Sequence, residues 1–262
     1  MPLAGFDRFE FVHEDAARAV YRRGQGPGVV IMHEIPGITP QVAAFAQRVA
    51  EQGFTVYLPL LFGTPGKPIS NLYMGQQLAL ACINREFSLL AKHASSPITD
   101  WLRALCRLAH QQCGGPGVGA VGMCLTGNFA LSLMVDASVM APVLCQPSLP
   151  VPVTASHKAA LHLSDEDLVV VKRRASHGCG VLALRFTADP LCTRARFETL
   201  RRELGDGFEA IEIDSRRGNA HGIPVTAHSV VTTDLVDEAG HPTQRALQRI
   251  LALFEERLKP RA

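Results

Sequence analysis

One cysteine of this chain lies in a segment whose glycine spacing could support nucleophilic chemistry. The pattern is Gly122-x-Cys124-x-x-Gly127, and it follows a small apolar run that begins at Val118. The run predicts a buried strand, the glycines predict a sharp turn, and the residues beyond have helical spacing. A strained turn between strand and helix projects its side chain away from a sheet. Peptide N–H groups and the positive end of the following helix would favour the thiolate of Cys124.

A nucleophilic thiol needs partners, and the chain supplies them further along. An imidazole must accept the proton of the thiol and later donate it, and a third group must orient the imidazole. In enzymes with this elbow the order is nucleophile, acid, histidine. Asp189 follows an apolar run over residues 181–186 and so occupies the place expected of the acid. The alternatives are that Cys124 is a small buried hydrophobe and that Asp189 only caps a turn before Pro190.

Two histidines compete for the imidazole role, and both lie between the last predicted strand and the final helix. His221 is nearer the strand, whereas His228 precedes Ser229 and is nearer the helix. Periodicity does not distinguish between them, so both remain candidates.

The elements that must position these residues alternate along the chain. This alternation predicts a mostly parallel central sheet with helices on both faces, and the strand–turn–helix pattern around Cys124 is that of an α/β-hydrolase fold. We expect a single domain over residues 1–262, in which residues 1–25 form antiparallel strands. The predicted strands are 9–13, 17–22, 29–32, 54–59, 118–123, 139–146, 181–186 and 208–213. The predicted helices are 40–52, 71–93, 99–112, 194–204 and 243–258.

Composition narrows the class of protein. The 262 residues are 47% hydrophobic with a net charge of +2, and the basic residues are scattered, so we expect neither nucleic-acid nor membrane partners. No apolar run reaches the roughly 18 residues of a membrane span, and residues 1–7 lack the plan of a secretory signal. Seven cysteines without a CxxC pair indicate neither a disulfide framework nor a metal site. A reducing cytoplasm is the expected location.

Four separated segments between about Val29 and Leu258 together resemble the dienelactone hydrolase family. They are the Glu-Ile-Pro-Gly segment at 34–37, the elbow around Cys124, the acid Asp189 and the His-Ser pair at 228–229. The resemblance implies a carboxylic ester hydrolase (EC 3.1.1.-) that cleaves an ester or lactone through a thioester. It favours His228 over His221 as the catalytic histidine.

The resemblance also implies individual roles. Cys124 would be the nucleophile, His228 the general base and later acid, and Asp189 the residue that orients the imidazole. Glu34 would face the thiol and help to bring it into its ionised state. The backbone N–H groups of Ile35 and Leu125 would form the oxyanion hole. A small-molecule ester or lactone would be the substrate, with no cofactor and no metal, in a monomer or homodimer.

Two residues depart from the family pattern. Thr126 stands where the family has a glycine after the cysteine, so the turn must accommodate a side chain. Thr232 stands where dienelactone-cleaving members have an arginine that binds the substrate carboxylate. An anionic dienelactone is therefore not the expected substrate, unless Arg85 or Arg185 holds the anion instead.

Three alternatives to a hydrolase follow from the same residues. A glutamine-amidotransferase-like enzyme also carries a cysteine on an elbow with a glutamate nearby. A binding protein could keep the fold without turnover. A redox sensor could use Cys124 as an exposed thiol of low pKa. No second cysteine that could form a disulfide with it is close in the sequence, but Cys192 lies near Asp189 and could be close in space.

Overall fold

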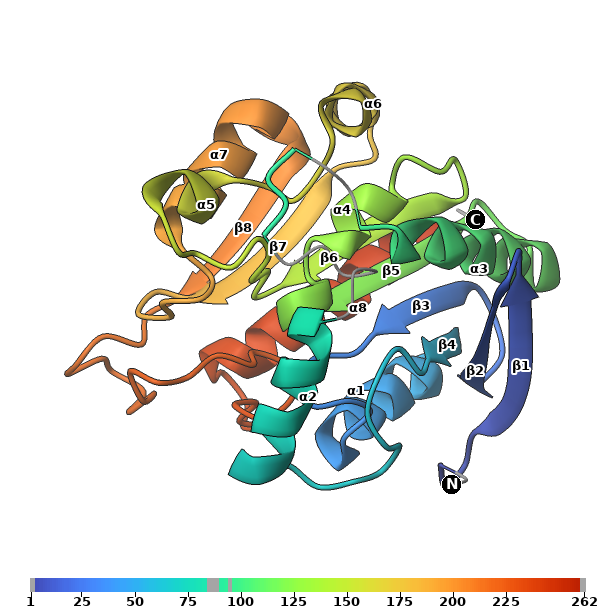
Figure 1. The fold of residues 1–262 in the computed structure, drawn as a ribbon, viewed down its shortest axis with the longest axis horizontal. Coiled ribbons are helices and arrows are strands. Elements are labelled where there is room, and N and C mark those ends of the chain that lie inside the picture. Colours follow the sequence, from blue (N-terminus) through green and yellow to red (C-terminus); the bar gives the residue numbers. More distant parts are fainter. Residues whose placement is uncertain (1–2, 84–89, 94–95, 260–262) are drawn as a thin grey trace.

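The strands form one eight-stranded sheet in the order β1-β2-β4-β3-β5-β6-β7-β8 (Figure 1). The computed structural model describes residues 3–83, 90–93 and 96–259. From β4 to β8 all neighbours are parallel, whereas β2 is antiparallel to both β1 and β4. The strands are β1 (Asp7–His13), β2 (Ala16–Arg23), β3 (Gly28–Met32), β4 (Thr55–Pro59), β5 (Val118–Met123), β6 (Val139–Cys145), β7 (Val181–Phe186) and β8 (Phe208–Ile213).

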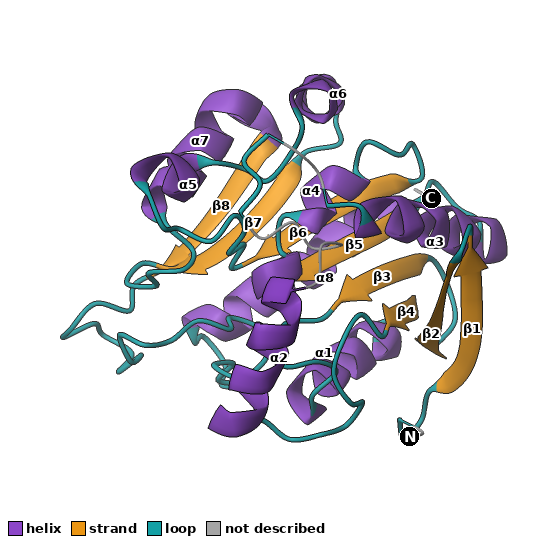
Figure 2. Ribbon diagram, viewed as in Figure 1, coloured by secondary structure: helices purple, strands orange, loops and turns teal. Residues whose placement is uncertain are grey.

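Helices cover both faces of this sheet (Figure 2). One apolar core lies between the sheet and α3, α4, α6 and α7, and the other lies between the sheet and α1 and α8. The helices are α1 (Pro40–Glu51), α2 (Asn71–Ile83), α3 (Ile98–Cys113), α4 (Phe129–Leu133), α5 (Ala155–Ala159), α6 (Asp165–Ser176), α7 (Arg194–Leu204) and α8 (Pro242–Leu258). The predicted α/β-hydrolase fold class is therefore confirmed.

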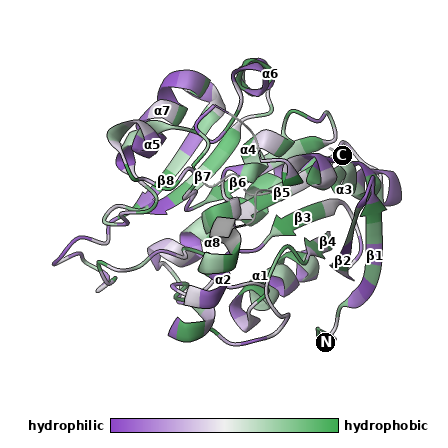
Figure 3. Ribbon diagram, in the orientation of Figure 1, coloured by the Kyte–Doolittle hydropathy of each residue, from purple (hydrophilic) through white to green (hydrophobic). Residues whose placement is uncertain are grey.

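The central strands have no solvent-facing side. Every residue of β3, β4, β5 and β7 is buried, since helices lie on both faces of a parallel sheet. Figure 3 shows the same strands as largely hydrophobic, while α6 and α7 carry polar residues on their outer surfaces. Continuous apolar runs, rather than alternating ones, were therefore the correct signal for these strands.

All eight predicted strands are present, and the helices differ from prediction in three places. The predicted helix 71–93 is described as α2 only to Ile83; residues 84–89, which include Arg85, lie outside the described part. The sequence analysis missed α5 and α6, although Ser164 caps α6 by accepting a hydrogen bond from the Asp167 N–H at 3.1 Å. The consecutive valines of α6 lack a clear helical period, and most of its side chains are not buried.

The third difference concerns the helix after the elbow. One turn of 3-10 helix spans Cys124–Thr126, and α4 begins only at Phe129 and is five residues long. Because β6 already begins at Val139, the crossover leaves little room for a longer helix. The expected contribution of a helix dipole to the thiolate is correspondingly smaller than a long helix would give.

Within the described residues, no helix is both long enough and apolar enough to span a membrane.

Candidate active site

The predicted site residues come from successive strand ends at one edge of the sheet. Glu34 follows β3, Cys124 follows β5, and Asp189 follows β7. His228 lies in the long segment between β8 and α8. The carboxyl edge of a parallel sheet is where α/β proteins bind ligands, because the loops that leave the strands meet there.

Cys124 occupies a strained turn that its glycines make possible. Its φ is +54°, in the left-handed region that non-glycine residues seldom adopt. A Cβ on Gly122 would lie 2.1 Å from the Thr126 carbonyl oxygen, and one on Gly127 would lie 2.4 Å from Cα of Pro147. Only glycine fits at either position. The sharp turn predicted from the spacing is therefore present, and it leaves the thiol half-buried.

Thr126 fits into this turn because its hydroxyl replaces missing backbone partners. The hydroxyl oxygen accepts a hydrogen bond from the Met123 N–H at 2.9 Å, and the hydroxyl lies 2.9 Å from the Met32 carbonyl as a donor. Thr126 is completely buried. The departure from glycine thus ties the end of β5 to the end of β3, and so fixes the elbow beside the loop that carries Glu34.

His228 and Asp189 form a hydrogen-bonded pair. The Nδ1 atom of His228 lies 2.7 Å from Oδ2 of Asp189, whose Oδ1 accepts from the Leu191 N–H at 2.9 Å. Asp189 is only 4% exposed. With Nδ1 donating to the carboxylate, the neutral imidazole presents Nε2 as a base, which is the tautomer that proton abstraction requires.

The other imidazole nitrogen of His228, Nε2, takes no part in the pair with Asp189. Nε2 of His228 is buried and has no partner of full hydrogen-bond geometry among the described residues. Burial disfavours the imidazolium, but the charge of Cys124 and the hydrogen bond to Asp189 outweigh burial and raise the pKa of His228 well above its usual value. Cys124 therefore lies within close electrostatic reach of this ring.

Asp234 holds the backbone of the histidine. Its Oδ2 accepts from the N–H groups of His228 at 2.9 Å and of Ser229 at 2.8 Å. Side-chain caps of this kind fix a turn that no strand or helix supports. The sequence analysis missed Asp234, although an aspartate shortly after the His-Ser pair is a recognisable turn signal.

The predicted oxyanion donors follow two neighbouring, paired strands. In the β3–β5 pairing Met32 is opposite Gly122, and Ile35 and Leu125 each follow three residues later. Leu125 is in the first turn of a 3-10 helix, where N–H groups lack partners within the helix. No turn or loop carbonyl of the described residues accepts from either N–H. Their role in binding an oxyanion stays a prediction.

Glu34 is buried and makes its hydrogen bonds away from Cys124. Its Oε2 accepts from Ser229 Oγ at 2.7 Å and from Gln146 Nε2 at 3.1 Å, and its Oε1 accepts from Thr232. Among the described residues, no hydrogen bond joins the Glu34 carboxylate to Cys124. The expected role of Glu34 toward the thiol stays a prediction, and Thr232, at the position of the family's arginine, instead binds this carboxylate.

His33 is hydrogen-bonded to the backbone of the loop that carries Glu34. Burial lowers its pKa to about 4, against the opposing effect of its hydrogen bond to the Glu34 carbonyl, so the ring is neutral. Its Nδ1–H donates to Glu34 O (3.1 Å), and its Nε2 accepts from the Leu61 N–H (3.0 Å). This buried residue, like Gln146, was missed because nothing in a single sequence marks it.

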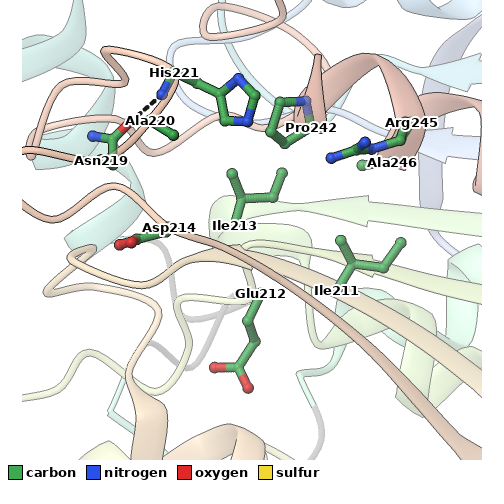
Figure 4. Close-up of a pocket in the computed structure, with 10 residues that line it drawn as sticks. All are labelled: Ile211, Glu212, Ile213, Asp214, Asn219, Ala220, His221, Pro242, Arg245 and Ala246. Carbon is green, nitrogen blue, oxygen red and sulfur yellow. Dashed lines mark hydrogen bonds between the residues drawn. The ribbon is translucent and has the colours of Figure 1, made fainter. Parts of the chain in front are cut away.

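The alternative histidine His221 lies in a different part of the molecule. It is exposed and lines a hollow of about 410 Å³ between β8 and α8, with a floor of Ile211 and Ile213. Figure 4 shows its ring facing Pro242, and its backbone N–H donates to Asn219 at 3.1 Å. The imidazole that the structure brings to Asp189 is His228.

Arg185, considered as an anion-binding residue, and Cys192, considered as a redox partner, both have ordinary structural surroundings. Arg185 donates to Glu212 at 2.8 Å and to the Thr187 carbonyl, so it is already paired. Cys192 is fully buried, and burial raises the pKa of its thiol. In the described part of the chain, no group of three or more His, Cys, Asp or Glu side chains could hold a metal ion.

Known proteins resemble this chain in sequence and in fold. A candidate carboxymethylenebutenolidase of Saccharomyces cerevisiae (strain ATCC 204508 / S288c) is 26% identical over 192 residues, which are 72% of this chain and 66% of that protein. The chain thus spans just under two thirds of the length of this relative.

Solved structures show the same fold at low identity. A candidate dienelactone hydrolase from Klebsiella pneumoniae subsp. pneumoniae MGH 78578 has a TM-score of 0.63 at 16% identity, covering 96% of this chain and 98% of that one. A dienelactone hydrolase-like promiscuous phosphotriesterase from metagenomic libraries has a TM-score of 0.59 at 17% identity, with 97% and 98% covered. The dienelactone hydrolase from Anabaena variabilis ATCC 29413 has a TM-score of 0.59 at 13% identity, with 97% and 100% covered.

A sequence profile of the dienelactone hydrolase family matches residues 16–258, nearly the whole chain, including every predicted site residue. The predicted family resemblance is therefore confirmed, and the chain belongs to the dienelactone hydrolase family.

Proposed function

We propose that this protein hydrolyses a carboxylic ester or lactone through a thioester on Cys124. The observation that carries the proposal is the hydrogen bond between Nδ1 of His228 and Asp189, on a ring whose pKa the charge of Cys124 raises. A cysteine nucleophile with an oriented imidazole is the arrangement that acyl transfer requires.

The first half of the proposed reaction forms the thioester. The Cys124 thiolate attacks the carbonyl carbon, a C–S bond forms, and the carbonyl electron pair moves to oxygen, where the N–H groups of Ile35 and Leu125 receive it. Each such donor typically contributes about 3 kcal/mol to the transition state. The tetrahedral intermediate then breaks its C–O bond, and the His228 imidazolium gives its proton to the leaving alkoxide.

The second half returns the free enzyme. His228 takes a proton from water as the oxygen attacks the thioester carbonyl, and the C–S bond breaks to release the acid and the thiolate. For a lactone the alcohol and the acid are parts of one product.

An uncharged substrate fits the described side chains better than an anionic one. Thr232 replaces the arginine that binds a carboxylate in dienelactone-cleaving relatives, and its hydroxyl is engaged by Glu34. The candidate carboxymethylenebutenolidase of yeast is named for a lactone substrate, so both esters and lactones belong in the test.

Mass spectrometry after brief exposure to p-nitrophenyl acetate tests the proposal. We expect an acyl adduct on Cys124 in the wild type. Cys124→Ala should lose turnover while it keeps its fold, and Cys124→Ser should be much slower because its hydroxyl does not ionise near neutral pH. An unchanged hydrolysis rate in Cys124→Ala would remove the thiol from the mechanism.

The rival functions have less support. The match to the dienelactone hydrolase family gives no support to a glutamine-amidotransferase-like activity. For a redox sensor, Cys192 is the neighbouring thiol, but its burial and raised pKa keep it protonated and poorly reactive.

A further inference from the structure

We propose that Gln146 is a positioning residue for the hydrolysis proposed above, on which this inference rests. Its side-chain amide joins the Glu34 loop (residues 33–37) to the His228 loop (residues 227–235). Through this link it sets the position of the imidazole relative to the elbow and the oxyanion donors.

The backbone places Gln146 at the centre of the site edge. It directly follows β6, which lies between β5, the strand of Cys124, and β7, the strand of Asp189. Gln146 is completely buried, its φ is +35°, and its N–H donates to the Leu184 carbonyl at 2.8 Å. Because the backbone of Gln146 is held in place in this way, its side chain can position the groups to which it is hydrogen-bonded.

The amide of Gln146 contacts both loops at once. Its Nε2 donates to Glu34 Oε2 at 3.1 Å, and its Oε1 accepts from the Val230 N–H at 3.4 Å. Val230 lies two residues after His228. Donor and acceptor are thus used on opposite sides, which a carboxylate or an apolar side chain of the same length would not reproduce.

The Glu34 carboxylate strengthens the link because it carries the charge of the cluster. Its other donors, Ser229 and Thr232, both belong to the His228 loop. No lysine, arginine or histidine among the described residues forms an ion pair with it. A buried carboxylate without a cation depends on neutral donors, and the loss of one leaves it poorly satisfied.

The consequence for chemistry is geometric. The Glu34 loop supplies the Ile35 N–H, and the His228 loop supplies Nε2, so the link determines the distance between the oxyanion donor and the proton carrier. Small displacements of such groups lower the rate without preventing substrate binding.

Gln146→Met tests the link with a side chain of similar length that has no donor. We expect kcat for p-nitrophenyl acetate to fall about tenfold with KM little changed, as loss of a hydrogen bond to a buried charge predicts. Thr232→Val, which removes another donor to the same carboxylate, should act in the same direction. Gln112→Met is the matched control, and its rate should stay at the wild-type value. Gln112 lies near the end of α3, shortly before β5 begins, and so at the opposite edge of the sheet from the strand ends that carry the site; its amide oxygen accepts a hydrogen bond from Tyr57 Oη at 2.7 Å.

Gln146→Glu provides a readout that a packing role would not move. An ionised glutamate would repel Glu34, whereas a protonated one can donate the hydrogen bond that the amide donates. We therefore expect the ratio of variant to wild-type kcat to rise as the pH is lowered from about 8 to about 5.5, toward the range in which carboxyl groups protonate. A flat ratio, or a wild-type kcat in Gln146→Met, would overturn the proposal.

Alkylation of Cys124 by iodoacetamide, followed at the modified peptide by mass spectrometry, separates this proposal from the proposed function. A displaced His228 stabilises the thiolate less, so the pH of half-maximal alkylation should be higher in Gln146→Met than in the wild type. This shift in a protein without esterase activity would support the role of Gln146 while the hydrolase proposal fails. An unshifted alkylation profile would count against Gln146.

Discussion

The imidazole of His228 is where the charges of the candidate site meet. Burial disfavours its imidazolium, but the charge of Cys124 and the hydrogen bond to Asp189 raise its pKa well above the usual value. A histidine whose pKa is higher in the folded than in the unfolded state stabilises the fold most below the unfolded pKa, about 6.5. That stabilisation is lost as the pH rises through the folded pKa.

Removal of the thiol should therefore change the titration of His228. The charge of Cys124 is the strongest influence that raises this pKa, so we expect the pKa of His228 to be lower in Cys124→Ala than in the wild type. Histidine NMR titration measures it directly, and His221→Gln, at an exposed histidine elsewhere, is the control that should leave the value unchanged. Equal His228 pKa values in Cys124→Ala and the wild type would contradict the proposed contact between thiol and imidazole.

The elbow is the element that places Cys124 at the end of β5, in the candidate site. Gly122 and Gly127 allow its backbone to pack closely, and Thr126 supplies a hydroxyl that joins β5 to β3. The glycine spacing was readable in the sequence because close backbone approach requires glycine. The use of Thr126 was not, since its acceptor on Met32 is distant in the chain.

Thr126→Val should destabilise the elbow with little change of side-chain volume. It leaves the buried Met123 N–H without an acceptor, which costs about 1–3 kcal/mol in the free energy of unfolding, and it should also lower kcat. Urea denaturation and p-nitrophenyl acetate hydrolysis measure the two effects. Thr126→Ser keeps the hydroxyl and should retain most of both, so equal losses in the serine and valine variants would show that the hydrogen bonds are unimportant.

At the scale of the whole molecule, one buried guanidinium connects the segment after β6 to α7. Arg196 is fully buried, and burial lowers its pKa to about 10, so it remains charged at neutral pH. Its nitrogen atoms donate to the carbonyl oxygens of Pro147, Pro150, His157, Ala160 and Leu191. These contacts hold together the segment that follows β6, the region of α5 and the loop that carries Asp189.

Arg196→Met should lower the stability of the whole fold. It leaves several buried carbonyls without donors, and we expect a loss of about 3 kcal/mol or more in the free energy of unfolding. Arg196→Lys keeps the charge but not the planar fork, so its loss should be intermediate. An unfolding midpoint equal to the wild type in the methionine variant would show that these contacts contribute little.

The sequence by itself determined the alternation of strands and helices, the turn at Cys124 and the place of Asp189 after a strand. These features depend on local periodicity and on the steric needs of glycine, which neighbouring residues express. The tertiary structure decided which histidine meets Asp189, because His221 and His228 lie in the same irregular segment and only its path separates them. It also decided that Gln146, Ser229 and Thr232 satisfy Glu34, since a buried charge is satisfied by groups that folding brings together from distant parts of the chain.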